Sequence, residues 1–262
     1  MRAKLQAHRG VSTDYPENTL AAFDAAADEG YAIVECDPKY TGDGVIVMHH
    51  DRTTVRTGRS ADGKPAPDKN VSDYAFDELR ALDFGLWKNE KFRGEKTPTL
   101  SETLEFAERR DMPLKIDNVW QGFPEGIKEK LFRETEASKA DVGFTCNTVE
   151  FVRYAVEHTT RGAIHYDGDL NEETLKTVKA AVGNRELYVW VCYDNELTGW
   201  FKGEKANAKV CARAKRYGKL GVWILSREDE REKAEAFGAE IIETTGSLKP
   251  SIRTSETNNS RR

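Results

Sequence analysis

Two short segments near the N-terminus hold residue types that can bind a metal ion and move protons. The first is His8-Arg9-Gly10, and the second runs from Glu35-Cys36-Asp37 to His50-Asp51. Glu35 and Asp37 are two positions apart, so on a β-strand both side chains point to one face. Because like-charged carboxylates repel each other, a hard cation with oxygen ligands is their natural partner. The set can hold a divalent metal and carry out acid–base chemistry on a phosphate ester.

A turn and two strands would bring these segments together. Residues 41–44, Thr-Gly-Asp-Gly, contain an Asp-Gly pair typical of a tight turn, and the apolar, β-branched run at 45–48 leads directly into His49 and His50. Upstream, a short strand is expected to end at His8, before a loop at 15–19 and a helix at 20–29. The chain therefore leaves the two carboxylates, turns, and returns with a histidine.

The order and spacing of these segments resemble those of the glycerophosphodiester phosphodiesterase family. The resemblance rests on HRG at 8–10, PENT at 16–19, E-x-D at 35–37 and T-x-D-G-V-x-V-x-H-H-D at 41–51, with weaker agreement at 82–87, 92–100 and 165–168. It implies an α/β fold, a (β/α)₈ TIM barrel, with a small inserted subdomain at 52–98. It also favours a catalytic role for His8 and His50, and a phosphate-binding role for Arg9, whose planar guanidinium can contact two phosphate oxygens.

Apolar, β-rich runs alternate with charged amphipathic stretches along the chain, as parallel strands covered by helices require. The expected strands are 5–8, 32–37, 114–118, 142–146, 162–166, 187–192, 221–225 and 240–243. The expected helices include 100–110, 125–135, 149–158, 172–182, 205–217 and 227–237. The length of 262 residues suits a single barrel domain at 1–250, followed by a polar, disordered tail at 251–262.

The resemblance further implies a metal site completed by a third carboxylate. In the family the corresponding strand carries a glutamate ligand, followed two residues later by a lysine that contacts phosphate. Here Asp117 is one methylene shorter than glutamate, and Val119 occupies the lysine position. Lys115 shares the strand face of Asp117 and is the expected replacement for the lysine. We therefore expect Glu35, Asp37 and Asp117 to bind one divalent ion, Mg²⁺, Ca²⁺ or Mn²⁺.

Two further residues, His165 and Trp190, are expected to line the substrate pocket. His165 lies at a predicted strand end, where a hydrogen-bonded structural role is the alternative. Trp190 lies within a predicted strand, where core packing is its plainest role, and its contact with substrate is implied by a similar tryptophan region in the family. Aromatic residues of the insertion, among them Phe84 and Trp87, could close over the mouth of the barrel.

The expected reaction is hydrolysis of a glycerophosphodiester to glycerol 3-phosphate and an alcohol. The metal and Arg9 would neutralise charge on the phosphate, while His8 and His50 act as base and acid in an order that the sequence leaves open. The resemblance implies that a glycerol hydroxyl attacks phosphorus to give a cyclic phosphate, which water then opens. One alternative is a lysophospholipase D-like enzyme or another phosphodiesterase. A non-catalytic ligand-binding barrel is another, motivated by Asp117 and Val119.

The composition of the chain argues against two kinds of partner, nucleic acids and the membrane interior. The chain has 40 Lys and Arg against 45 Asp and Glu, a formal charge of −5, and no extended basic run, which argues against nucleic-acid binding. No apolar signal region precedes the first strand, and no later run reaches membrane-spanning length, so a cytoplasmic protein without stable membrane insertion is expected. The four cysteines are scattered and are expected to be reduced and mostly buried. The oligomeric state stays open.

Overall fold

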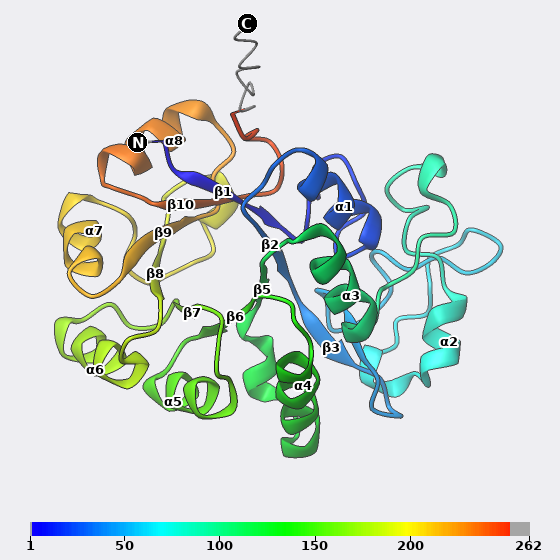
Figure 1. Ribbon diagram of the computed structural model, residues 1–262. Coiled ribbons are helices and arrows are strands. Elements are labelled where there is room, and N and C mark those ends of the chain that lie inside the picture. The colour runs from blue at the N-terminus through cyan, green and yellow to red at the C-terminus, as the bar shows by residue number, and fades with distance from the viewer. Residues whose placement is uncertain (1, 252–262) are drawn as a thin grey trace, which may run out of the picture.

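Eight parallel strands close into a barrel in the computed structural model, which describes residues 2–251 (Figure 1). Their order around the barrel is β1-β10-β9-β8-β7-β6-β5-β2, so the first and last strands pair. The bounds are β1 (Lys4–His8), β2 (Ile33–Cys36), β5 (Leu114–Ile116), β6 (Val142–Cys146), β7 (Ile164–Tyr166), β8 (Leu187–Cys192), β9 (Lys219–Trp223) and β10 (Ile241–Thr244). The predicted TIM barrel is confirmed, and its predicted strands differ from these by one or two residues at several ends.

Helices cover the outside of the barrel (Figure 1). They are α1 (Leu20–Asp28), α3 (Leu100–Arg110), α4 (Glu125–Ala137), α5 (Val149–His158), α6 (Glu172–Val182), α7 (Ala208–Lys215) and α8 (Glu228–Ala236). Several begin at a side chain that accepts a hydrogen bond from the first turn, as Thr19 does from the backbone of Ala22. Thr99 and Glu102 form a reciprocal capping box at the start of α3. These caps explain why the predicted starts of the helices agree closely with the structure.

The strands are buried on both faces. One face packs against the helices through large apolar side chains such as Phe106, Phe132 and Phe144. A smaller cluster, built on Tyr188, Trp190 and Ile241, is separate from that core. Tyr188 and Trp190 are two positions apart on β8, so their side chains share one face of the strand and both point into the barrel. Gly221 on the neighbouring strand makes room for them, because a Cβ there would lie 2.5 Å from the Trp190 ring.

Strand register brings chemically important residues to one level inside the barrel. In the pairing of β1 with β2, His8 lies opposite Glu35, and in the pairing of β2 with β5, Glu35 lies opposite Lys115. Gln6 on β1 lies opposite Glu243 on β10. A barrel interior rich in charged groups is unusual for a core, and it indicates a functional end of the barrel.

A hairpin and an inserted segment interrupt the barrel after β2. The antiparallel strands β3 (Pro38–Tyr40) and β4 (Ile46–Met48) form a separate two-stranded sheet. Residues 52–98 follow and hold α2 (Phe76–Ala81) and two short 3₁₀ helices, η1 (Val71–Asp73) and η2 (Glu90–Phe92). A small apolar cluster that includes Val71, Tyr74 and Leu79 stabilises this segment. Figure 1 shows α2 to one side of the barrel.

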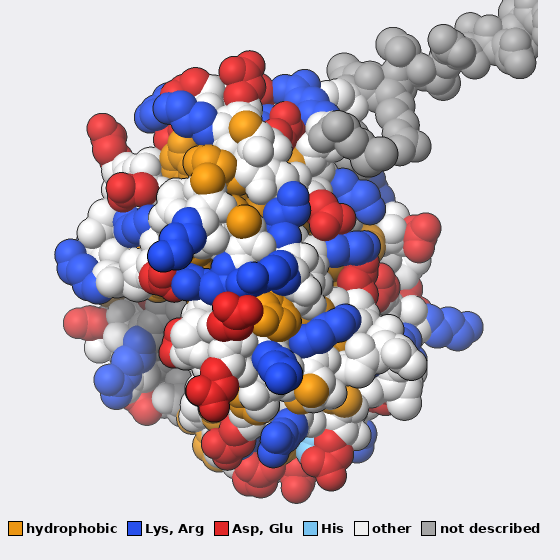
Figure 2. Space-filling view, turned by 90° about the vertical axis from the view of Figure 1, so that its left-hand side faces the viewer, with side chains coloured by type: hydrophobic (Ala, Val, Ile, Leu, Met, Phe, Trp, Pro, Cys, Tyr) orange, Lys and Arg blue, Asp and Glu red, His pale blue; other side chains and the backbone are white. Residues whose placement is uncertain are grey.

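The surface mixes both signs of charge. Figure 2 shows acidic and basic side chains interspersed over one face, with only small apolar areas between them. Many are paired, as Arg216 is with Glu172 at 3.1 Å. The cysteines are free and buried, as expected. Among residues 2–251, no helix combines the length and the apolar composition needed to cross a bilayer. A disordered tail was predicted at 251–262, and its residues from 252 onward lie outside the part of the chain that the structure describes.

Candidate active site

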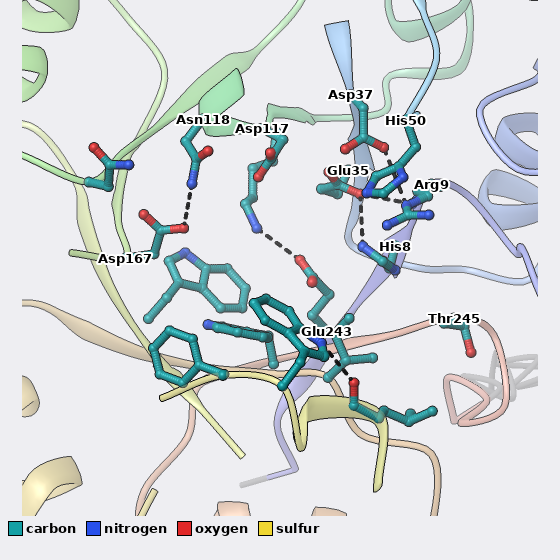
Figure 3. Close-up of a pocket in the computed structure, with 18 residues that line it drawn as sticks. His8, Arg9, Glu35, Asp37, His50, Asp117, Asn118, Asp167, Glu243 and Thr245 are labelled. Carbon is teal, nitrogen blue, oxygen red and sulfur yellow. Dashed lines mark hydrogen bonds and ion pairs between the residues drawn. The ribbon is translucent and has the colours of Figure 1, made fainter. Parts of the chain in front are cut away.

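A pocket of about 580 Å³ opens at the carboxyl ends of the barrel strands (Figure 3). Its wall is formed by residues that follow or end most of the strands, so distant segments of the chain contribute to it. Polar residues line much of it, and aromatic and aliphatic residues line the rest. The lining residues are His8, Arg9, Glu35, Asp37, His50, Lys115, Asp117, Asn118, Asn147, Asp167, Trp190, Leu197, Trp200, Phe201, Trp223, Ile224, Glu243 and Thr245.

A tight turn after β1 places His8 and Arg9 on this wall. Arg9 has φ 58° and Gly10 has φ 76°, so the chain turns through two left-handed residues. Gly10 is pressed against helix α1, where a Cβ would lie 2.6 Å from the carbonyl oxygen of Ala22. Asn18 donates its backbone N–H to the Arg9 carbonyl at 3.1 Å, which closes the turn. Glycine is therefore required at position 10 by conformation and by space.

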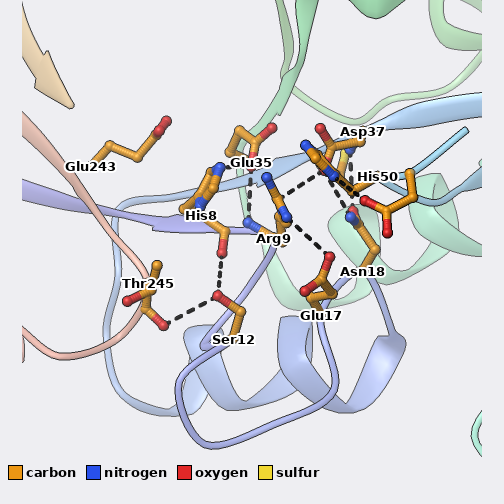
Figure 4. A network of polar contacts seen from close by, with 12 residues as sticks. His8, Arg9, Ser12, Glu17, Asn18, Glu35, Asp37, His50, Glu243 and Thr245 are labelled. Atoms are coloured by element: carbon orange, nitrogen blue, oxygen red, sulfur yellow. Dashed lines mark hydrogen bonds and ion pairs between the residues drawn. The ribbon is translucent and has the colours of Figure 1, made fainter. Parts of the chain in front are cut away.

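The Arg9 guanidinium lies between carboxylates (Figure 4). Its Nη1 donates to Glu17 Oε1 at 3.0 Å, and its Nε lies 3.3 Å from Asp37 Oδ2. The backbone N–H of Arg9 donates to Glu35 Oε2 at 2.9 Å. Asn18 donates its side-chain amide to Asp37 Oδ2 at 2.8 Å. Arg9 is therefore fixed beside the carboxylates, where its charge also reaches the pocket.

Three carboxylates line one part of the pocket, and of these Glu35 and Asp37 are buried while Asp117 is partly exposed. Burial raises the pKa of Glu35 well above its usual range, and the charge of Asp37 raises it further. Burial and Asp37 together raise the pKa of Asp117 to about 6. Burial also acts on Asp37, but the charges of Arg9, His50 and His8 and the hydrogen bond from Asn18 together outweigh it and hold the pKa of Asp37 below its usual value. Negative charge in this cluster exceeds what Arg9 alone compensates.

The donor set of this cluster suits a hard divalent cation, because it consists of carboxylate oxygens that repel one another. Within residues 2–251, no three acidic, histidine or cysteine side chains lie close enough together to ligate one ion. Asp37 and Glu35 instead contact Arg9 and its backbone. The fit to a metal therefore rests on the chemistry of the carboxylate oxygens and on their common pocket, and the described side chains do not form a ready three-ligand site.

The two histidines line the same pocket in different environments. The His8 side chain is largely buried, with its Nε2 3.9 Å from Glu35 Oε2, and burial lowers its pKa to about 4 even though Glu243 raises it. The His50 side chain is 40% exposed and its Nδ1 lies 2.6 Å from Asp51 Oδ1. His49, the adjacent histidine, is buried and contacts the carbonyl of Thr53 at 3.1 Å. Of these three, His8 and His50 reach the pocket.

A series of ion pairs connects His50 to Glu17 through Asp51 and Arg56. Arg56 Nε donates to Asp51 Oδ2 at 2.5 Å, and Arg56 Nη2 donates to Glu17 Oε1 at 2.6 Å. Glu17 also accepts from Arg9. Although burial raises the pKa of Asp51, hydrogen bonds from His50 and Arg56 hold it below its usual range. Arg56, which belongs to the inserted segment, is thus linked to Glu17 in the loop before α1 and, through Asp51, to His50.

Lys115 lies at the bottom of the pocket and is already paired. Its Nζ donates to Glu243 Oε2 at 2.8 Å and lies 4.2 Å from the centre of the Trp190 ring. Gln6 donates to the same carboxylate oxygen of Glu243. Although burial lowers the pKa of Lys115, the carboxylates of Glu243, Glu35 and Asp117 together raise it above its usual value. Lys115 lines the pocket as predicted from sequence, and its role toward phosphate stays a prediction.

His165 and Trp190 lie side by side but at different depths. Trp190 lines the pocket and donates its indole N–H to His165 Nδ1 at 2.9 Å. His165 is buried below it, stacked on Tyr188 with ring centres 5.0 Å apart. Burial lowers the pKa of His165 well below its usual value. His165 therefore supports the tryptophan rather than facing the pocket, so any effect on substrate would act through Trp190.

Several pocket residues were not identified from the sequence. Glu243 ends the predicted strand 240–243 directly after the apolar pair Ile241-Ile242, and a charge in that position was a usable signal. Asp167 directly follows β7, and Asn118 begins the 3₁₀ helix η3 (Asn118–Gly122) next to Asp117. Asn147 directly follows β6. Polar residues immediately after barrel strands were the common signal.

The aromatic part of the wall comes from an unexpected segment. Trp200 and Phe201 belong to the loop between β8 and α7, next to the short 3₁₀ helix η4 (Glu196–Thr198). The side chain of Trp200 is 68% exposed at the rim, and Leu197 is 46% exposed. The insertion at 52–98, whose aromatics were expected to cover the mouth, contributes none of the described residues that line this pocket.

Comparisons with known sequences match the first half of the chain to one family. The sequence model of the glycerophosphoryl diester phosphodiesterase family matches residues 8–149. A glycerophosphodiester phosphodiesterase from Caldanaerobacter subterraneus is 38% identical over 136 residues, which cover 51% of this chain and 52% of that protein. A putative glycerophosphodiester phosphodiesterase from Bacillus subtilis is 40% identical over 125 residues, 48% of each chain. The matched regions cover about half the length of each of these curated relatives.

Solved structures share the fold over nearly the whole chain. A phosphodiesterase from Oleispira antarctica, solved with the product sn-glycerol-3-phosphate, superposes with a TM-score of 0.72 at 22% identity and covers 94% of both chains. A glycerophosphoryl diester phosphodiesterase from Parabacteroides distasonis gives a TM-score of 0.71 at 22% identity, covering 93% of this chain and 83% of the other. At these identities the likeness concerns the barrel itself.

Proposed function

Because the chain belongs to the glycerophosphoryl diester phosphodiesterase family, we propose that it hydrolyses glycerophosphodiesters to glycerol 3-phosphate and an alcohol. The observation that carries the proposal is the common pocket of His8, His50 and Arg9 beside three carboxylates. A phosphodiester needs its negative charge neutralised and two protons moved, and these residue types provide both functions.

The surroundings of Arg9, His50 and His8 favour a different role for each side chain in the reaction. Arg9 would bind the non-bridging oxygens, since its guanidinium is held at the wall by Glu17 and Asp37. The Asp51 carboxylate lies 2.6 Å from His50 Nδ1 and fixes the orientation of the imidazole ring, so we assign to His50 the proton donation to the departing alcohol oxygen. His8 would then accept the proton of the attacking hydroxyl. Microscopic reversibility exchanges these two roles when water opens a cyclic phosphate.

Glu35, Asp37 and Asp117 would hold a divalent cation. When bound, such an ion supplies Lewis-acid stabilisation to the charged phosphate oxygens and relieves repulsion within the carboxylate cluster. Mg²⁺, Ca²⁺ and Mn²⁺ all suit oxygen ligands of this kind.

A second candidate is favoured by the pocket rim. Trp200 and Leu197 expose large apolar surfaces beside the pocket, which suits an amphiphilic substrate such as a lysophospholipid. Rates on soluble glycerophosphocholine and on micellar lysolipid separate the two substrate classes. Faster turnover of the micellar substrate would favour the lysophospholipase D-like activity.

The direct test is product analysis by phosphorus NMR. The purified chain, supplied with a divalent metal, is expected to convert glycerophosphocholine into glycerol 3-phosphate and choline. A His8→Ala variant that keeps its fold is expected to lose this activity. Absence of turnover in the wild type with each of the three metals and both substrate classes would favour a non-catalytic ligand-binding barrel.

A further inference from the structure

A second cavity of about 390 Å³ adjoins the main pocket. The two cavities share Asp167 and the aromatic side chains Trp190, Phe201 and Trp223. Figure 3 shows Asp167 across the main pocket from His8 and Arg9. The remaining described residues of its wall are Gly168, Asp169, Leu170, Cys192, Gly203 and Glu204. The wall therefore combines carboxylates with aromatic rings, and none of its described residues is basic.

Asp167 differs from the other two acidic residues of this wall. Asp169 accepts from the backbone and side-chain nitrogens of Asn171 at 2.9 and 2.6 Å, and Glu204 is paired with Arg213. Asp167 Oδ2 accepts from Asn118 at 3.0 Å, but its Oδ1 is buried with no hydrogen-bond partner among residues 2–251. A buried carboxylate oxygen without a donor is unfavourable, so Asp167 lacks one positively charged or N–H partner.

The aromatic rings face the same space. Phe201 and Trp223 pack edge to face with ring centres 5.2 Å apart, and Trp190 completes the wall they share with Asp167. Aromatic faces attract cations, and tryptophan does so most strongly. Lys115 already lies over the Trp190 ring, which illustrates that preference within this protein. A carboxylate next to aromatic faces is complementary to an ammonium group.

We propose that Asp167, Trp190, Phe201 and Trp223 form a subsite for a positively charged ammonium group on the alcohol part of the diester. The inference rests on the proposed function, because it assigns the alcohol to the side of the pocket opposite the catalytic histidines. A primary ammonium would donate a hydrogen bond to Asp167 Oδ1. A trimethylammonium would contact the aromatic faces, with Asp167 supplying charge. A neutral alcohol could offer Asp167 only an uncharged hydroxyl donor and would make no cation–π contact, so the subsite favours the ammonium group over it.

The experiment compares three substrates on three proteins. Glycerophosphoethanolamine and glycerophosphocholine carry the two kinds of ammonium group, and glycerophosphoglycerol carries none. The proteins are the wild type, Asp167→Asn, and the matched control Asp169→Asn, whose carboxylate lies in the same cavity but is exposed and already bonded. Titration of ethanolamine and choline, followed by tryptophan fluorescence, measures binding to the cavity without turnover.

The wild type is expected to prefer the ammonium substrates. Asp167→Asn is expected to lower kcat/KM for both by about 10-fold or more, mainly through KM, because a charge-assisted contact is lost. Its kcat/KM for glycerophosphoglycerol is expected to stay within about twofold, and Asp169→Asn is expected to have little effect on any substrate. A larger loss for glycerophosphoethanolamine would show that its primary ammonium is hydrogen-bonded to Asp167, and equal losses for both ammonium substrates would show that Asp167 acts through its charge.

Equal losses on all three substrates, or a wild type that prefers glycerophosphoglycerol, would overturn the subsite while leaving the phosphodiesterase activity intact. If no diester is hydrolysed, the proposed function fails, and the fluorescence titration decides the subsite by itself. Binding of ethanolamine or choline that Asp167→Asn weakens would then support the subsite. Binding unaffected by that substitution, or no binding, would refute it.

Discussion

Lys115 Nζ lies 2.8 Å from Glu243 Oε2, although β5 and β10 are not neighbours in the barrel. Both side chains are buried, so the pair connects two strands through the barrel interior at the bottom of the pocket. Lys115 is the residue expected to replace a missing phosphate-binding lysine. The Lys115 ammonium therefore stabilises the barrel interior through its ion pair with Glu243, and it also lines the pocket.

Lys115→Met is expected to destabilise the protein by about 3–5 kcal/mol, because Glu243 would remain buried without its partner. Thermal unfolding measures this loss. The double variant Lys115→Met/Glu243→Gln is expected to regain part of the stability, since it removes the unpaired charge. An unchanged melting temperature with a raised KM would instead assign Lys115 mainly to phosphate binding.

Substitution of the pocket histidines is expected to affect catalysis more than stability. His8→Ala and His50→Ala should each lower kcat by roughly 10²-fold or more, the usual loss for a general acid or base. His49→Ala is the comparison, because His49 packs against Phe84 and contacts Thr53. It should lower the melting temperature and largely spare kcat below that temperature. Similar kcat losses for His49 and His50 would show that the wrong histidine has been placed in the pocket.

Removal of divalent metal is expected to abolish activity, and Mg²⁺, Mn²⁺ or Ca²⁺ should restore it. Calorimetry on the chelator-treated protein provides a readout independent of turnover. Asp117→Asn should weaken metal binding, because it removes one of three carboxylates from the cluster, while Asp169→Asn should leave it unchanged. Full activity of a metal-free sample would contradict the metal-site prediction.

Two glycines with similar backbone angles test the turn that carries Arg9. Gly10 has φ 76° and Gly30 has φ 80°, but a Cβ meets Ala22 at position 10 and nothing within 4 Å at position 30. Gly30→Ala should cost about 1–2 kcal/mol from the left-handed conformation alone. Gly10→Ala should cost more and also lower kcat, because the clash displaces His8 and Arg9. Equal stability losses and unchanged kcat would show that the turn adapts without moving them.

The barrel was predicted from the family resemblance of the motifs at 8–51, and the alternation of apolar runs with amphipathic stretches agreed with it. The Glu35-x-Asp37 spacing and the hairpin that returns His50 are also short-range features, and these residues do share a pocket. Glu243 was missed because its partners, Lys115 and Gln6, lie more than a hundred residues away. The β8–α7 loop was missed because the position of Trp200 depends on packing against Trp223, which no periodic pattern encodes. His165 was placed at the correct strand end but not at the correct depth.

Closure of the barrel by β1 and β10 has a consequence for how the protein is made. Lys4 pairs with Ile241 and Ala7 with Thr244, so these contacts join nearly opposite ends of the described chain. Contacts this distant in sequence raise the contact order and slow folding, because a long loop must close before they form. During synthesis, a nascent chain that lacks β10 leaves β1 and β9 as open sheet edges, which can pair with other chains. β1, which ends at His8, therefore gains its second neighbour only after all the other barrel strands have been synthesised.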